Sequence, residues 1–125
     1  MVINSWHNFV KTKDVGILDN LLSEAIIFYS PVVHTPQRGF NITKKYLEAA
    51  SIVLFNGSFK YINEIHENNS AICEFECELN NTYINGIDII SWDYKNKITS
   101  FKVMVRPLKG ILLLKERMAE ILLKN

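Results

Sequence analysis

One acidic residue interrupts an otherwise apolar segment of the chain. Residues 84–92 read INGIDIISW, and Asp88 stands between two isoleucines. Alternation along a strand places Asp88 on the same face as Ile90 and Trp92, so we predict that it lies in an apolar pocket. A carboxyl group buried there without a charged partner has a raised pKa, and it can serve as an acid, a base or a hydrogen-bond donor near neutral pH.

His34 is the second candidate for proton chemistry. It lies in VVHTPQRG, which we predict to be a loop because the segment contains a proline and a glycine. Histidine titrates near neutral pH and can pass a proton to or from a ligand. The alternative is a loop histidine that only hydrogen-bonds its own turn. His7 and His66 are expected at the surface.

Two cysteines, Cys73 and Cys77, lie four residues apart in AICEFECEL. On one strand they share a face, but about 13 Å separates them. That separation exceeds the limit of about 7 Å between the Cα atoms of a disulfide. We therefore predict two small apolar core residues. No partners for a metal site stand out, so we predict neither a metal nor a cofactor.

Composition narrows the class of protein. The chain has 125 residues, of which 48% are hydrophobic, and 14 basic against 13 acidic residues leave a net charge of +1. This favours one domain over residues 1–125 and argues against a nucleic-acid partner. No segment reaches the roughly 18 apolar residues of a membrane span, and the first residues lack the pattern of a signal peptide. We expect no membrane association and a cytoplasmic location.

The elements that must position Asp88 follow from periodicity and turn residues. Helices are expected over residues 2–12, from a cap at Asp14, and over residues 41–57 with Asn41 or Thr43 as cap and Gly57 at the end. A strand in AIIFYSP precedes the third helix, and Pro107 begins a last one. Between them lie four strands in FKYINEIHE, SAICEFECEL, TYINGIDIISW and KITSFKVMV. Their short connections predict an antiparallel meander.

These elements predict an α+β fold in which a strongly curved antiparallel sheet wraps around the N-terminal helices, with a C-terminal helix. Alternation places Glu74, Glu76 and Glu78 on the outer face, and we expect them opposite Lys102 and Arg106. The strand TYINGIDIISW is apolar on both faces. We therefore predict that a second copy of the chain covers its outer face, which would make the protein a homodimer.

The order of these segments resembles the nuclear transport factor 2-like superfamily, and within it the SnoaL-like branch. The resemblance rests on the first helix, on IIFYSPVV with the following RGF, on NGIDIISWDYKNKITSFKVMVRP and on the closing helix. It implies a cone-shaped fold that commonly forms a homodimer through its sheets. The superfamily contains ketosteroid isomerases, polyketide cyclases, epoxide hydrolases, dehydratases and non-enzymatic modules, so fold does not determine function.

The resemblance allows three catalytic positions of ketosteroid isomerases to be compared with residues of this chain. Asp88 matches an aspartic acid that ketosteroid isomerases keep protonated as a hydrogen-bond donor to the substrate. Their catalytic base lies before a proline at the end of the first strand, where this chain has Ser30, and a serine cannot abstract a proton without a base beside it. Their phenolic donor lies on the first helix, where Trp6 stands here. Of these three catalytic groups, this chain retains only the aspartic acid. We therefore do not expect it to isomerise ketosteroids by the mechanism of those enzymes.

Two functions remain open from the sequence. In the first, the cone binds a small apolar, carbonyl-bearing molecule and acts as an isomerase, cyclase or dehydratase, with Asp88 as the acid or base and His34 as its helper. The expected ligand-binding residues are Trp6, Ser30, Tyr61, Phe75, Cys77, Phe101 and Val103. In the second, the protein is a non-catalytic ligand-binding or dimeric interaction module, and Asp88 is structural, accepting a hydrogen bond from a neighbour such as Trp6 Nε1.

Overall fold

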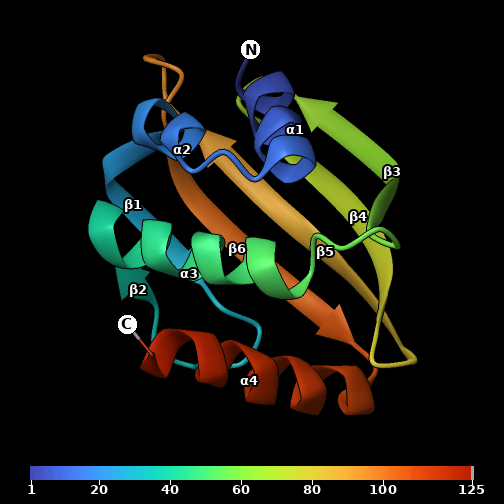
Figure 1. Cartoon of the computed structure of the whole chain (residues 1–125). Helices are drawn as coiled ribbons and strands as arrows, with labels where there is room; N and C mark the ends of the chain where they lie inside the picture. The colour runs from blue at the N-terminus through green and yellow to red at the C-terminus, as the bar shows by residue number, and fades with distance from the viewer. Residues whose placement is uncertain (125) are drawn as a thin grey trace.

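The computed structural model describes residues 1–124 and shows an α+β fold (Figure 1). The helices are α1 (Val2–Thr12), α2 (Gly16–Leu21), α3 (Phe40–Val53) and α4 (Leu108–Leu123). The strands are β1 (Leu22–Tyr29), β2 (Gln37–Arg38), β3 (Lys60–Glu67), β4 (Ser70–Leu79), β5 (Thr82–Trp92) and β6 (Ile98–Arg106). The α+β class and the C-terminal helix are confirmed.

The six strands form one sheet in the order β2-β1-β6-β5-β4-β3. Strands β3 to β6 make the predicted antiparallel meander. The predicted antiparallel sheet needs one correction: it is a mixed sheet, because β1 pairs with β6 in parallel. The short turns between β3, β4, β5 and β6 made the meander predictable. Strands β1 and β6 lie far apart in the sequence, and no short connection between them indicates their relative direction.

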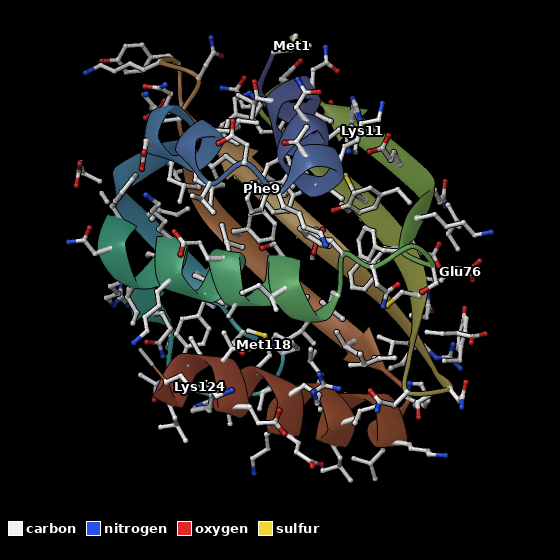
Figure 2. All side chains as sticks on the ribbon, in the orientation of Figure 1. Met1, Phe9, Lys11, Glu76, Met118 and Lys124 are labelled. Carbon is white, nitrogen blue, oxygen red and sulfur yellow. The ribbon has the colours of Figure 1, made fainter. Side chains whose placement is uncertain are left out.

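Three helices, α1, α2 and α3, lie on one face of the bent sheet, and α4 lies beyond α3 at one end of it (Figure 1). Helix α3, from the middle of the chain, packs on β1 and on α4. The sheet therefore curves around α3 as well as around the N-terminal helices. Phe9 of α1 is fully buried between the helices and the sheet (Figure 2). The result is a cone with an open sheet. Within residues 1–124, no helix has both the length and the apolar character needed to cross a membrane.

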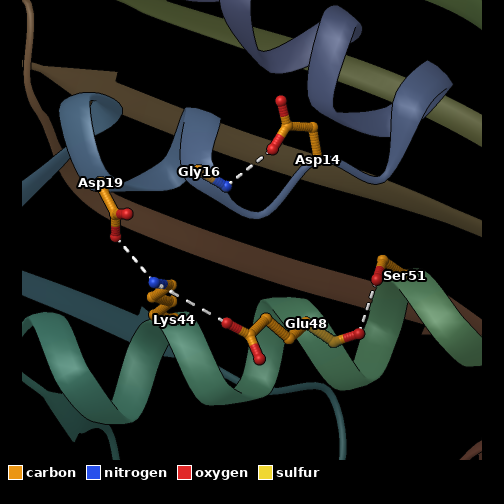
Figure 3. Close-up of polar contacts among 6 residues, drawn as sticks. All are labelled: Asp14, Gly16, Asp19, Lys44, Glu48 and Ser51. Atoms are coloured by element: carbon orange, nitrogen blue, oxygen red, sulfur yellow. Dashed lines mark hydrogen bonds and ion pairs between the residues drawn. The ribbon is translucent and has the colours of Figure 1, made fainter.

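The starts of two helices differ from the predicted caps. Asp14 does not cap α2 directly, because the cap residue is Val15. The Asp14 carboxylate instead accepts a hydrogen bond from the backbone N–H of Gly16 at 3.0 Å (Figure 3). In α3 the cap is Gly39, whose φ of 108° suits glycine, and neither Asn41 nor Thr43 has this role.

Helix α3 also ends earlier than predicted, at Val53 rather than near Gly57. Its first turns are fastened to α2 by Lys44, whose Nζ lies 2.7 Å from a carboxylate oxygen of Asp19 (Figure 3). This ion pair lies at the surface and links α2 to α3 on the helical side of the sheet.

The inner face of β4 matches the prediction from alternation. Cys73, Phe75 and Cys77 are buried, and both cysteines are free thiols. The expected charge pairs on the outer face are wrong, because β5 lies between β4 and β6. Asn85 of β5 occupies the intervening position: its Nδ2 donates to Glu74 Oε2 at 3.1 Å, and its Oδ1 accepts from Arg106 Nη1 at 3.4 Å.

Candidate functional site

A cavity of about 240 Å³ lies between the inner face of the sheet and helices α3 and α4. Its sheet wall contains the aromatic rings of Phe28, Phe75 and Phe101, and α4 contributes apolar side chains such as Met118. The lining is almost entirely apolar, as is usual for small-molecule sites that carry a few placed polar groups. Among the described residues, its charged members are Asp88 and Lys115 of α4, which is exposed.

Asp88 projects from the middle of β5 into this apolar surrounding and is only 5% exposed. Its neighbours across the sheet are Cys73 of β4 and Val103 of β6. Tyr61 of β3 donates a hydrogen bond from its hydroxyl to Asp88 Oδ2 at 2.5 Å. Within residues 1–124, the Asp88 carboxyl has no other hydrogen bond, so Oδ1 remains available on the cavity wall.

Trp6 of α1 completes a chain of polar groups behind the cavity. Its Nε1–H donates to the hydroxyl oxygen of Tyr61 at 2.8 Å, and Tyr61 in turn donates to Asp88. Trp6 therefore bonds Tyr61 rather than Asp88 itself. The three residues come from α1, β3 and β5, so the orientation of the Asp88 carboxyl depends on the packing of three separate elements.

Burial raises the pKa of Asp88 from 3.8 to about 7, and the hydrogen bond from Tyr61 opposes this shift only in part. Burial, followed by the negative charge of Asp88, raises the pKa of Tyr61 well above 10.0. Tyr61 therefore keeps its proton and acts as the donor. Below about pH 7 the Asp88 carboxyl is neutral, and it can donate a hydrogen bond from the oxygen that Tyr61 does not use.

The structure brings together most of the residues predicted to bind a ligand. The cavity lining includes Trp6, Ser30, Phe75, Phe101 and Val103. Two predicted residues do not lie on that lining. Cys77 is buried elsewhere on the inner face of β4, and Tyr61 lies behind Asp88 and holds it.

His34 is not brought together with Asp88. It is exposed, and it lines an open groove on the outer side of the loop after β1, beside Tyr29 and Lys102. Ser30 does line the cavity, but its Oγ accepts the backbone N–H of Val32 at 3.1 Å and that of Val33 at 3.4 Å. The described residues therefore place no base beside the Ser30 hydroxyl.

Sequence reasoning missed the direct role of Tyr61 because of an irregularity in β3. Tyr61 pairs with Phe75 and Asn63 with Glu74, so the register shifts at Ile62. Strict alternation groups Tyr61 with Asn63, whereas this bulge brings Tyr61 and Glu64 to the inner face. The signal that pointed to Tyr61 was only its residue type, an aromatic residue with a hydrogen-bonding end.

In residues 1–124, no three histidine, cysteine, aspartate or glutamate side chains form a metal site. No protein-family model matches the chain, and no curated protein sequence matches it either. Solved structures do match. A steroid delta-isomerase from Pseudomonas aeruginosa is 29% identical, with a TM-score of 0.92, and the match covers 98% of this chain and 90% of that one.

Two further structures have the same fold at lower identity. An NTF2-like protein of unknown function from Cytophaga hutchinsonii is 17% identical, with a TM-score of 0.66 over 87% of this chain and 90% of that one. The epoxide hydrolase/cyclase-like enzyme SalBIII is 16% identical, with a TM-score of 0.67 over 84% of this chain and 88% of that one. The curved sheet, the covering helices and these likenesses agree: the chain has the fold of the nuclear transport factor 2-like superfamily.

Proposed function

We propose that the protein binds a small, largely apolar molecule in the cavity and that Asp88 hydrogen-bonds a carbonyl oxygen of that molecule. The observation that carries the proposal is a buried carboxyl with one oxygen held by Tyr61 and the other free on the wall of an apolar cavity. A neutral carboxyl is a hydrogen-bond donor, and a donor placed at a developing negative charge lowers the energy of an enol-like transition state. The chemistry thus belongs with isomerases, cyclases and dehydratases.

The likeness to a structure named steroid delta-isomerase supports a ligand of this type. It does not support isomerisation by two carboxyl groups, because Ser30 stands where the resemblance to ketosteroid isomerases places the second carboxylate, and its Oγ already accepts two backbone N–H groups. Reactions that need one acid or base group, such as dehydration or ring closure, fit the described residues better.

Two matched bicyclic probes test the binding site. The ketone 2-tetralone carries one carbonyl oxygen, and tetralin has the same ring system without it. We expect Asp88→Leu to weaken ketone binding about tenfold, the equivalent of one net hydrogen bond, and to leave tetralin binding almost unchanged. Trp6, whose ring lines the cavity, provides a fluorescence signal for both titrations.

The control variant for this experiment is Ala119→Trp. Ala119 is exposed and lines the cavity, so a large side chain there should block both probes without disturbing the core. Ketone affinity should also fall above about pH 7, where Asp88 loses its proton. Equal binding of both probes by wild-type protein and by Ala119→Trp would show that the cavity is not their site.

A non-catalytic binding module remains the second candidate, and one observation favours it. Asp88 already has a protein partner, since Tyr61 and Trp6 form an ordered chain behind it. An enzyme and a binding module would differ in whether they catalyse a reaction of the bound ketone. The enzyme should catalyse exchange of deuterium from solvent at the carbon beside the 2-tetralone carbonyl, at a rate that Asp88→Asn lowers, whereas a module should bind the ketone without exchange.

We also propose that two copies of the chain associate through the outer face of the sheet. Four apolar side chains gather there on β4, β5 and β6, in the paired rows Ile72 with Ile89 and Ile87 with Met104. Ile72 is 40% exposed and Met104 50% exposed. Such a contiguous apolar patch on a sheet is typical of an interface between subunits.

Sedimentation at micromolar concentration tests the association. Wild-type protein should have twice the chain mass of 14.5 kDa, and Ile72→Asp should have the mass of one chain because it places a charge in the patch. Leu112→Asp is the matched control, since Leu112 is an exposed apolar residue of α4 and lies away from the sheet face. A single-chain mass for wild-type protein would contradict the proposal.

A further inference from the structure

Three inward-facing side chains with transferable protons form a row across the sheet. Glu64 of β3 is the Cα partner of Cys73 of β4, and Cys73 is the Cα partner of Asp88 of β5. Directly opposed residues of antiparallel strands have Cβ atoms about 4.5–5.5 Å apart, so each side chain reaches the next. The row leads from the buried carboxyl toward the edge of the sheet at β3.

The outer end of the row is open to solvent. Glu64 is exposed, and its Oε1 lies 2.5 Å from Nε2 of His7, a residue of α1. The Cys73 thiol is fully buried and lies directly across the strand pair from Glu64, within reach of its carboxylate. Burial, then the interaction with Glu64 and the charges of Glu64 and Asp88, raise the pKa of the thiol, so Cys73 stays protonated.

The ligand cavity offers a poorer path for a proton. Its walls are apolar, and apolar cavities tend to stay dry, so they hold no chain of water molecules along which a proton can move. A bound ligand would close this path completely. Among the described residues, the titratable or charged groups around Asp88 are Tyr61 from β3 and Cys73 from β4 beside it and, on the cavity wall, Tyr46 from α3 and Lys115 from α4.

We propose that Cys73 and Glu64 form a proton-exchange route between Asp88 and solvent, separate from the opening through which a ligand enters. In one concerted step the Asp88 carboxyl gives its proton to the Cys73 sulfur while the thiol proton passes to the Glu64 carboxylate. The sulfur remains neutral throughout, and the net change is one proton moved from Asp88 to Glu64. Glu64, held by His7, then releases the proton to water.

Such a route would let Asp88 exchange its proton with solvent while a ligand fills the cavity. Its use in turnover rests on the proposed function, but the route itself can be tested on ligand-free protein. Failure of the route and failure of ligand binding are therefore separate results.

Carbon NMR of the Asp88 carboxyl measures proton exchange near its pKa. We expect one moving resonance for wild-type protein, and Cys73→Ala should slow exchange by on the order of 100-fold, so that two resonances or one broadened signal appear. Cys73→Ser should restore fast exchange, because a hydroxyl can accept one proton while it donates another. The midpoint of the titration should stay close to that of wild type in both.

Two further variants separate the route from effects of packing. Glu64→Gln leaves the core untouched and keeps an oxygen that accepts the thiol proton's hydrogen bond, but it cannot take the proton, so exchange should slow as in Cys73→Ala. Cys77→Ala removes the other buried thiol of the same strand face and should leave exchange fast. Fast exchange in both Cys73→Ala and Glu64→Gln would overturn the proposal, as would slow exchange in Cys73→Ser.

Discussion

Replacing Asp88 with asparagine should remove a loss of stability that wild-type protein undergoes as the pH rises. The pKa of Asp88 is 3.8 for an ordinary carboxyl of this type and about 7 in the folded protein. Between these values the folded state holds one proton more than the unfolded state, so the free energy of unfolding decreases with rising pH. About three pKa units correspond to roughly 4 kcal/mol, all of it lost by about pH 8.

Urea unfolding at intervals from pH 3 to pH 8 measures this effect as the difference between wild type and Asp88→Asn. The other titrating groups are the same in both proteins, so their effects cancel in the difference. Asparagine keeps an oxygen that can accept the Tyr61 hydroxyl, so the polar chain behind the cavity is preserved. A difference that stays constant over the whole range would mean that Asp88 titrates normally.

Tyr61→Phe provides the matched comparison, with the opposite sign. The Tyr61 hydrogen bond favours the charged form of Asp88, since it lowers the pKa of that carboxyl. Without it, the pKa should rise further, and the fall in stability should extend to higher pH than in wild type. This variant separates the contribution of Tyr61 from the larger effect of burial.

Replacing Gly86 with alanine should destabilise the protein by about 3 kcal/mol, because the methyl group has nowhere to go. A Cβ atom at this position would lie 2.5 Å from Cζ of Phe75 and 2.6 Å from the backbone oxygen of Met104. The ring lies in the cavity wall and is stacked on Phe59 at a centroid distance of 5.1 Å, so a shift of the ring would disturb that packing. The oxygen belongs to the neighbouring strand β6 and cannot move without distorting the ladder.

Urea unfolding of Gly86→Ala beside Gly57→Ala tests this packing. Gly57 has no atom within 4 Å of an added Cβ, so its alanine variant should be as stable as wild type or slightly more stable. Adding Phe75→Leu to Gly86→Ala should recover part of the loss, since the ring is removed but the clash with the Met104 oxygen remains. If Gly86→Ala matched Gly57→Ala, the close approach of Phe75 would be disproved.

The position of Asp88 illustrates what alternation along a strand can predict. The two-residue period of β5 placed Asp88 on the inner face, and the structure finds it there, buried beside the cavity. The same rule predicted that Cys73 and Cys77 lie inside. Short connections rich in turn residues also showed that β3 to β6 pair in sequence. Alternation and turns act over a few neighbouring residues, so the sequence records them directly.

The partner of Asp88 could not be found in this way. Tyr61 reaches the carboxyl because β3 has a bulge at Ile62, and a bulge reverses the faces of the residues beyond it. Alternation alone therefore gave no reason to place Glu64 inside with Cys73. The row from Glu64 to Asp88 depends on pairing between three strands, which is a property of the assembled sheet.

The sequence by itself determined the fold class, the meander and the inward direction of Asp88, because local periodicity and turn chemistry are enough for each. Only the tertiary structure decided that β1 runs parallel to β6, that Tyr61 holds Asp88 and that His34 lines a neighbouring groove rather than the cavity. Each of these depends on contacts between segments far apart in the chain. Such contacts are set by how helices and strands pack together, and no short pattern of residues encodes them.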